Sequence, residues 1–492
     1  MISPTPGIMA IKLPTLYLLI FNLFNAFLGL LCLYDPGFFA DAYLPLFLFS
    51  GLVLCWNMFD KFRNILFLSR TFFLAVIGYF PMAVKVFAGP NALFSAWEPR
   101  SQDFSVVIIM YALTSMALLA NEVGLRCGRL FLHYDQATAS AELEKKGYDV
   151  LFWVSLLLVA MIGFQSASQG QLRTSEAYSL DYEKTFLGLG NYNAIGAIMM
   201  MTALLSIKRD KSKVKLVLLT VVAGYYLIWG ILLRGARQDV ITPILGCYIV
   251  YFIADRKLPV ISKKTFAVCV FVFWFGLTFG RLRMSAMSNL SFKDVFVLFT
   301  YMKDRALESD MYDLDFISAI STTFSNTIYM IQNNFIGFSY GESYLDFILR
   351  TPPKFLYPDR PEDLALLFEN HGLITGGGVF ELAEGYLNFG ILGALIVPFV
   401  ISFVISRFFW QALFRQSLWR YFLLFAFLSV WLRGALYQTF AYYKSIITAM
   451  IMYVGLKILL LVMEELKTCA RPRARTLEKS SGPSVMRISE NG

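Results

Sequence analysis

Two pairs of arginines stand at the ends of apolar segments, where a charged side chain needs a reason. Arg234 and Arg237 lie in the turn RGARQD, and Arg281 and Arg283 end the segment FGRLR. A spacing of three residues places Arg234 and Arg237 on one face if a helix continues through them. Guanidinium groups bind phosphate oxygens through two hydrogen bonds at once. The pairs therefore predict a site for a phosphate, a diphosphate or a carboxylate, with anchoring at the aqueous interface as the alternative.

A fifth arginine lies inside an apolar segment. Arg433 stands in WLRGALYQTFAYY, and Tyr437 follows one turn later. A charge within a membrane span is costly and usually faces a cavity or a partner. We therefore assign Arg433 to the predicted anion site, with a buried ion pair that fixes helix packing as the alternative. Arg70, in contrast, is predicted to extend from its span toward the cytoplasmic surface.

Two carboxylates stand just before an apolar segment, in the glycine-rich stretch TGGGVFELAEGYLNFG. Glu381 and Glu384 are candidate catalytic residues, because a carboxylate at the edge of a membrane cavity can take a proton from a sugar hydroxyl. Pairing with an arginine is the alternative role, and the sequence leaves both open. His371 is a third candidate acid or base.

The composition of the chain indicates that these residues belong to a membrane protein. The chain has 492 residues, of which 57% are hydrophobic and 16% are charged, whereas soluble domains are nearer a quarter charged. We predict an all-α polytopic membrane protein with about twelve transmembrane helices and a large, partly helical outer loop. The predicted spans are 13–33, 42–59, 64–88, 104–121, 149–166, 190–207, 216–233, 239–254, 265–282, 386–409, 421–443 and 445–463.

Alternate loops between these spans are rich in lysine and arginine, as in KRDKSKVK at 208–215 and RPRAR at 471–475. Positive charge collects on the cytoplasmic side, so both termini are predicted to be cytoplasmic. The predicted units are a bundle of nine spans (1–283), a periplasmic loop (284–385), three further spans (386–467) and a disordered cytoplasmic tail (468–492). From Asp294 to Glu384, acidic residues outnumber lysine and arginine.

Several signatures of other chemistry are missing from the sequence. It has no phosphate-binding loop with Gly-Lys, no dinucleotide fingerprint, no Cys/His metal spacing and no serine elbow. We therefore expect no metal, no cofactor and no nucleic-acid partner.

The late part of the chain carries the most specific pattern. It reads GESY at 341–344, PP at 352–353, YP at 357–358 and EGYLNFG at 384–390, with a further glycine at 393. Together with about a dozen spans, the Arg-Gly-Ala-Arg turn and the long outer loop, this pattern resembles the oligosaccharide repeat-unit polymerases of bacterial surface polysaccharides, the O-antigen polymerases (Wzy type). The resemblance implies a GT-C-like fold, similar to that of O-antigen ligases, with a cap over a lipid-diphosphate cavity. It also implies functional roles for Arg234, Arg237, Arg281 and Glu384.

The implied donor is a growing glycan on a polyprenyl diphosphate, and the implied acceptor is one repeat unit on a second carrier. Arginines would stabilise the charge on the leaving diphosphate without a metal. We expect Tyr386, Asn388 and Tyr437 to contact sugars. Further expected partners are membrane lipids, a flippase and a chain-length regulator, in the bacterial inner membrane.

Two alternatives remain open at this point. An O-antigen ligase would use the same chemistry with the lipid A core as its acceptor. A flippase or transporter of lipid-linked oligosaccharides would show internal repeats and charges at the membrane midplane. The absence of a repeat and the large outer loop favour the enzyme.

Overall fold

The computed structural model describes residues 13–88, 103–130, 145–168, 192–227, 237–262, 315–349, 379–431 and 439–480, together with single residues between 357 and 371 and Gly434. In this part of the chain all regular structure is helical. Seven of the described helices are long and apolar enough to cross a membrane, which confirms a helical, membrane-embedded protein. The count of about twelve spans and the GT-C-like resemblance stay predictions.

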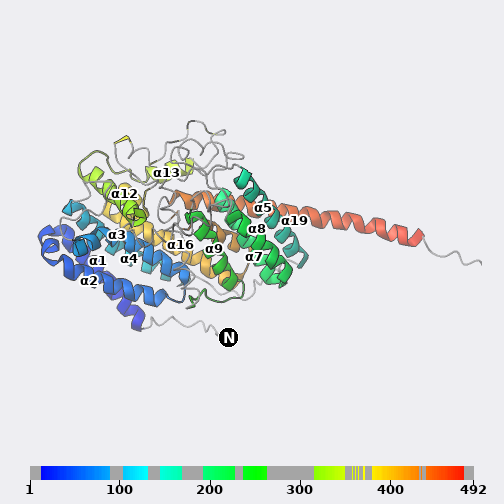
Figure 1. Ribbon diagram of the computed structural model, residues 1–492, viewed down its shortest axis with the longest axis horizontal. Coiled ribbons are helices and arrows are strands. Elements are labelled where there is room, and N and C mark those ends of the chain that lie inside the picture. Colours follow the sequence, from blue (N-terminus) through cyan, green and yellow to red (C-terminus); the bar gives the residue numbers. More distant parts are fainter. Residues whose placement is uncertain are drawn as a thin grey trace, which may run out of the picture.

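Four N-terminal helices form one side of the molecule (Figure 1, blue to cyan). They are α1 (Leu13–Tyr34), α2 (Pro36–Lys61), α3 (Ile65–Ala88) and α4 (Phe104–Leu130). Inside this group, hydrogen bonds between polar side chains connect neighbouring helices. Asn22 and Asn57 exchange hydrogen bonds of 3.3 and 3.1 Å, and Asn25 donates to Tyr79 at 2.9 Å and accepts from Ser50 at 2.8 Å. In a membrane, an apolar side chain contacts lipid as favourably as it contacts another helix. Hydrogen bonds of this kind therefore help to hold the helices together.

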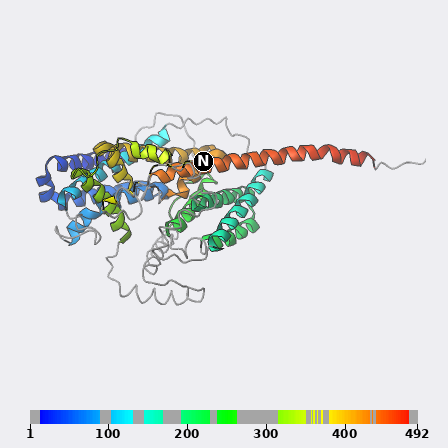
Figure 2. The same ribbon diagram turned by 90° about the horizontal axis from the view of Figure 1, so that it is seen from above.

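A second group of helices packs around α7 (Tyr192–Asp210). Its members are α5 (Lys145–Ser168), α8 (Lys213–Tyr225), α9 (Arg237–Ile253) and α17 (Leu418–Ser429). The final helix, α19 (Phe440–Ser480), runs along α17 and then extends beyond the rest of the molecule (Figures 1 and 2). Buried apolar residues of both groups belong to one continuous core.

Helix α16 (Gly393–Arg415) crosses α4 at very short range because small residues meet at the contact. A Cβ on Gly124 would lie 2.5 Å from a backbone oxygen of α16, and one on Gly128 would lie 2.6 Å from the carbonyl oxygen of Phe403. Opposite them stand Ser402 and Ser406, also four residues apart, and the Ser406 hydroxyl donates to a backbone oxygen of α4 at 2.6 Å. This is the close packing that small residues permit in membrane helices.

We expect Gly128→Leu to separate α4 from α16 and to lower the free energy of unfolding by about 1–3 kcal/mol, because backbone on the facing helix cannot yield as a side chain can. The measurement is thermal unfolding of the purified protein in detergent. Gly455→Leu is the matched control, since nothing lies within 4 Å of that glycine's Cβ position. Equal stability of the two variants would contradict this packing.

Part of the region predicted as an outer loop packs inside the bundle. Helix α12 (Asp315–Gln332) contacts α3, α4 and α15 (Glu381–Phe389). Its middle is polar yet buried, and the Ser321 hydroxyl donates to the Ile77 carbonyl at 2.8 Å. A second short helix, α13 (Glu342–Leu349), contacts α19. The predicted boundary between loop and bundle stays a prediction.

Helix α15 folds back along the start of α16. The turn consists of the 3-10 helix η7 (Gly390–Leu392), in which Gly390 has φ +57°, a conformation that favours glycine. Beyond it, a Cβ on Gly393 would lie only 1.8 Å from the Gly385 carbonyl oxygen. The predicted span 386–409 therefore joins parts of two helices, and α16 continues to Arg415.

The predicted span 421–443 is also interrupted. Helix α17 ends at Ser429, where Val430 leaves the helical region with φ −127° and ψ 16°. The chain then reverses: the Tyr442 hydroxyl donates to the Trp431 carbonyl at 3.2 Å, and the Tyr442 ring occupies the place of a side chain at Gly434. Apolar composition alone did not reveal this turn, and the described residues on either side of it, Trp431 and Thr439, are themselves buried.

Candidate functional site

Helix α15 presents a stripe of polar side chains. Glu381, Glu384 and Asn388 are spaced by three and four residues, which places them on one side of the helix. All three are at most 1% exposed. Each contacts a different part of the molecule, so this short helix connects α3, the start of α13 and the start of α19.

Glu381 forms a two-pronged ion pair with Arg70 of α3. Arg70 Nη1 donates to Oε2 at 3.0 Å and Nη2 donates to Oε1 at 2.6 Å. The Arg70 Nε donates to the Ser402 hydroxyl at 2.7 Å, and that hydroxyl donates to Asn121 Oδ1 at 2.7 Å. Asn121 in turn donates to Thr71 at 3.1 Å. A buried ion pair is tolerated when further hydrogen bonds satisfy its charges, as they do here.

The expected extension of Arg70 toward the cytoplasmic surface is wrong. The side chain is 1% exposed and points into the bundle, where the Glu381 carboxylate and Ser402, near the middle of α16, provide partners. In the structure Glu381 pairs with an arginine, which is the alternative role considered for it above. The partner is an arginine outside the predicted anion site.

Glu384 is bonded on one side only. Its Oε2 accepts hydrogen bonds from the backbone N–H of Thr439 at 3.1 Å and from the Thr439 hydroxyl at 2.6 Å. The carboxylate thereby caps the start of α19, where unpaired backbone N–H groups favour negative charge. The other oxygen, Oε1, is buried and has no hydrogen-bond partner among the described residues.

The buried glutamates of the described residues differ in whether a cation lies beside the carboxylate. Glu122 pairs with Lys61 and Arg126, and Glu381 pairs with Arg70. Glu384 has no cation beside it within the described ranges. A buried polar atom left without a partner costs free energy, and such atoms in native proteins often belong to functional sites.

Asn388 links α15 to the residues at the start of α13. Its Oδ1 accepts from the backbone N–H of Gly341 at 3.0 Å, and its Nδ2 donates to the Ser343 hydroxyl at 2.7 Å and to the Glu384 carbonyl at 2.8 Å. Tyr386, on another side of the helix, packs edge-on against Phe338 at 5.9 Å between ring centroids. These contacts make Asn388 a structural bridge, and its side-chain hydrogen bonds are already used.

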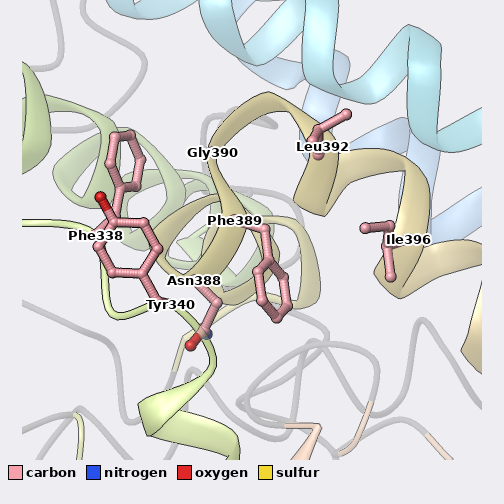
Figure 3. Close-up of a pocket in the computed structure, with 7 residues that line it drawn as sticks. All are labelled: Phe338, Tyr340, Asn388, Phe389, Gly390, Leu392 and Ile396. Atoms are coloured by element: carbon pink, nitrogen blue, oxygen red, sulfur yellow. The ribbon is translucent and has the colours of Figure 1, made fainter.

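A pocket of about 300 Å³ lies at the tip of the α15–α16 hairpin (Figure 3). Its walls are almost entirely apolar, with Asn388 at one edge. The lining residues are Phe338, Tyr340, Asn388, Phe389, Gly390, Leu392 and Ile396.

The structure brings four of the predicted site residues onto α15: Glu381, Glu384, Tyr386 and Asn388. His371 is exposed, and its ring lies 6.5 Å from that of Phe335. The backbone of Arg237 begins α9, and its side chain lies outside the described residues. The remaining predicted residues, Arg234, Arg281, Arg283, Arg433 and Tyr437, also lie outside them.

Sequence reasoning missed the partners of these carboxylates. Arg70 had a usable signal, because an arginine within an apolar span is expected to face a partner. Thr439 had none, since threonine is not unusual in its segment. Tyr344 stands within the GESY pattern at 341–344 but was given no role. The Tyr344 hydroxyl is buried without a hydrogen-bond partner in the described part of the chain, and its ring stacks on Phe389 at 6.1 Å.

Comparison with protein-family models, with curated proteins and with solved structures gave no match. The class that fold and composition define is a helical membrane protein with a buried, partly unsatisfied polar centre on a short internal helix.

Proposed function

We propose that the protein is a membrane glycosyltransferase that polymerises polyprenyl-diphosphate-linked oligosaccharide repeat units. Its product is a surface polysaccharide, an O-antigen of lipopolysaccharide or an exopolysaccharide, made at the outer face of the bacterial inner membrane. The observation that carries the proposal is the buried Glu384 carboxylate, of which one oxygen has no hydrogen-bond partner among the described residues. The sequence resemblance around residues 384–390 gives the proposal its substrate class.

The chemistry needs one bond made and one broken. The acceptor hydroxyl attacks the anomeric carbon of the donor, and the bond from that carbon to the lipid diphosphate breaks with its electron pair on the diphosphate oxygen. The hydroxyl proton passes to Glu384 Oε1. Arginines stabilise the charge on the leaving diphosphate, the role proposed for Arg234, Arg237 and Arg281.

The test is polymerisation by the purified protein supplied with repeat-unit lipid alone, with products of two or more units as the positive result. We expect Arg234→Lys and Arg237→Lys to lower this activity by about 10- to 100-fold, because lysine keeps the charge but loses the two-pronged geometry. Arg256→Lys, beyond the other end of α9, is the control. Normal activity in both variants would reduce these arginines to interface anchors.

A transporter of lipid-linked oligosaccharides is the second candidate, and two observations favour it. Helix α15 is only nine residues long, and α17 ends after twelve, so both are short helices within the bundle. The Arg70–Glu381 pair also lies inside the bundle. Broken helices and internal charges are typical of transporters. Movement of the lipid across vesicles without polymer formation would select this candidate, whereas transfer only to lipid A core would select a ligase.

A further inference from the structure

We infer that Glu384 and Tyr344 together form a binding site for one sugar hydroxyl, in which Tyr344 orients the acceptor. This inference rests on the proposed function, because it names how the same site would hold its acceptor. It assigns a role to Tyr344, to which the sequence analysis gave none.

Asn388 joins the segment that carries Tyr344 to the backbone of Glu384. Its Nδ2 donates both to the Ser343 hydroxyl at 2.7 Å and to the Glu384 carbonyl at 2.8 Å, so the neighbour of Tyr344 and the backbone of Glu384 share one amide group. The Tyr344 ring then stacks on Phe389, five residues after Glu384, at 6.1 Å with an interplanar angle of 19°. These contacts place the Tyr344 ring against the C-terminal end of α15.

Each side chain has one buried polar atom without a partner among the described residues. These atoms are the Tyr344 hydroxyl and Glu384 Oε1. One is a donor and the other an acceptor, so a single alcohol group satisfies both: its oxygen accepts from Tyr344 and its hydrogen is donated to Glu384. Two unsatisfied buried atoms of opposite need, on segments that these hydrogen bonds and the ring contact join, indicate a ligand of that kind.

The phenol keeps its proton in this setting. Burial raises the pKa of Tyr344 above its ordinary value, and the charges of Glu384 and Glu381 raise it further. Tyr344 therefore remains a hydrogen-bond donor throughout the reaction. Glu384 receives the acceptor's proton as the new carbon–oxygen bond forms and the diphosphate leaves.

Tyr344→Phe separates this role from a structural one. Removing a buried hydroxyl that has no protein partner is expected to leave the melting temperature unchanged or to raise it. Turnover of the purified protein with repeat-unit lipid is expected to fall by at least about 10-fold. The control is Tyr421→Phe, which removes another buried tyrosine hydroxyl on α17. A fall in turnover matched by a fall in melting temperature, or no fall, overturns the inference.

A second measurement distinguishes failure of this inference from failure of the proposed function. Binding is measured with repeat-unit lipid and with the same lipid lacking the hydroxyl used in the product linkage. We expect the wild-type protein to bind the complete lipid more tightly, and Tyr344→Phe to lose that preference. If the wild-type protein and Tyr344→Phe show the same preference for the complete lipid, the hydroxyl site is refuted. Preserved discrimination without any polymer refutes the polymerase while retaining the site.

Discussion

Glu384→Gln is expected to lower the rate of polymerisation by about 10²–10⁴-fold, the usual loss when a general base is removed. This loss corresponds to about 3–5 kcal/mol of transition-state stabilisation. Glutamine preserves the shape of the side chain, and its carbonyl oxygen can still accept from the Thr439 N–H and hydroxyl. Binding of repeat-unit lipid is therefore expected to change little.

The measurement is single-turnover polymerisation by the purified variant, together with lipid binding and thermal unfolding. Thr439→Val is the matched control, because it removes one hydrogen bond to the carboxylate and leaves the carboxylate in place. If Glu384 served only to cap α19, Glu384→Gln would keep the two hydrogen bonds from Thr439 and with them stability, lipid binding and turnover. Near-normal turnover would reject Glu384 as the base.

Arg70→Met is expected to lower the free energy of unfolding by about 3–5 kcal/mol, because it leaves the Glu381 carboxylate buried without its partner. The double variant Arg70→Met/Glu381→Met is expected to recover most of this loss. It replaces the ion pair with two apolar side chains of similar length, and such replacements are often neutral. Unfolding by denaturant in detergent measures both effects.

Lys208→Met is the control for this series. Its partner Asp255 lies 2.7 Å away, but the two side chains are 17% and 39% exposed. Exposed pairs contribute about 0–1 kcal/mol, so the control is expected to remain near wild-type stability. If Arg70→Met were as stable as Lys208→Met, the buried ion pair would contribute no more to the free energy of unfolding than the exposed one.

The membrane class of the fold followed directly from composition, because apolar length is a property of the sequence itself. The interruptions did not follow. The turn at Gly390 and the reversal before Thr439 occur inside apolar sequence, so hydropathy extends through them. They depend instead on tertiary contacts, such as the Tyr442 ring against Gly434.

The same distinction holds for the site. The spacing of Glu381 and Glu384 beside Asn388 was visible in the sequence, and the structure places them on one helix. Which carboxylate is neutralised was not visible, because Arg70 is more than 300 positions away in the chain. Local pattern therefore located the candidate residues, and only the packing of α3 against the hairpin assigned them different environments.

The carboxylate of Glu384 is also hydrogen-bonded to the start of a long helix. Helix α19 has 41 residues, and at 1.5 Å per residue it is about 60 Å long. Its first turn is held by Glu384 through Thr439, while its far end extends beyond the other helices. A displacement of α19 along its axis would therefore move Thr439, the hydrogen-bond partner of this carboxylate. A protein that bound the distal part of α19 would thus act on the surroundings of Glu384 without contacting it.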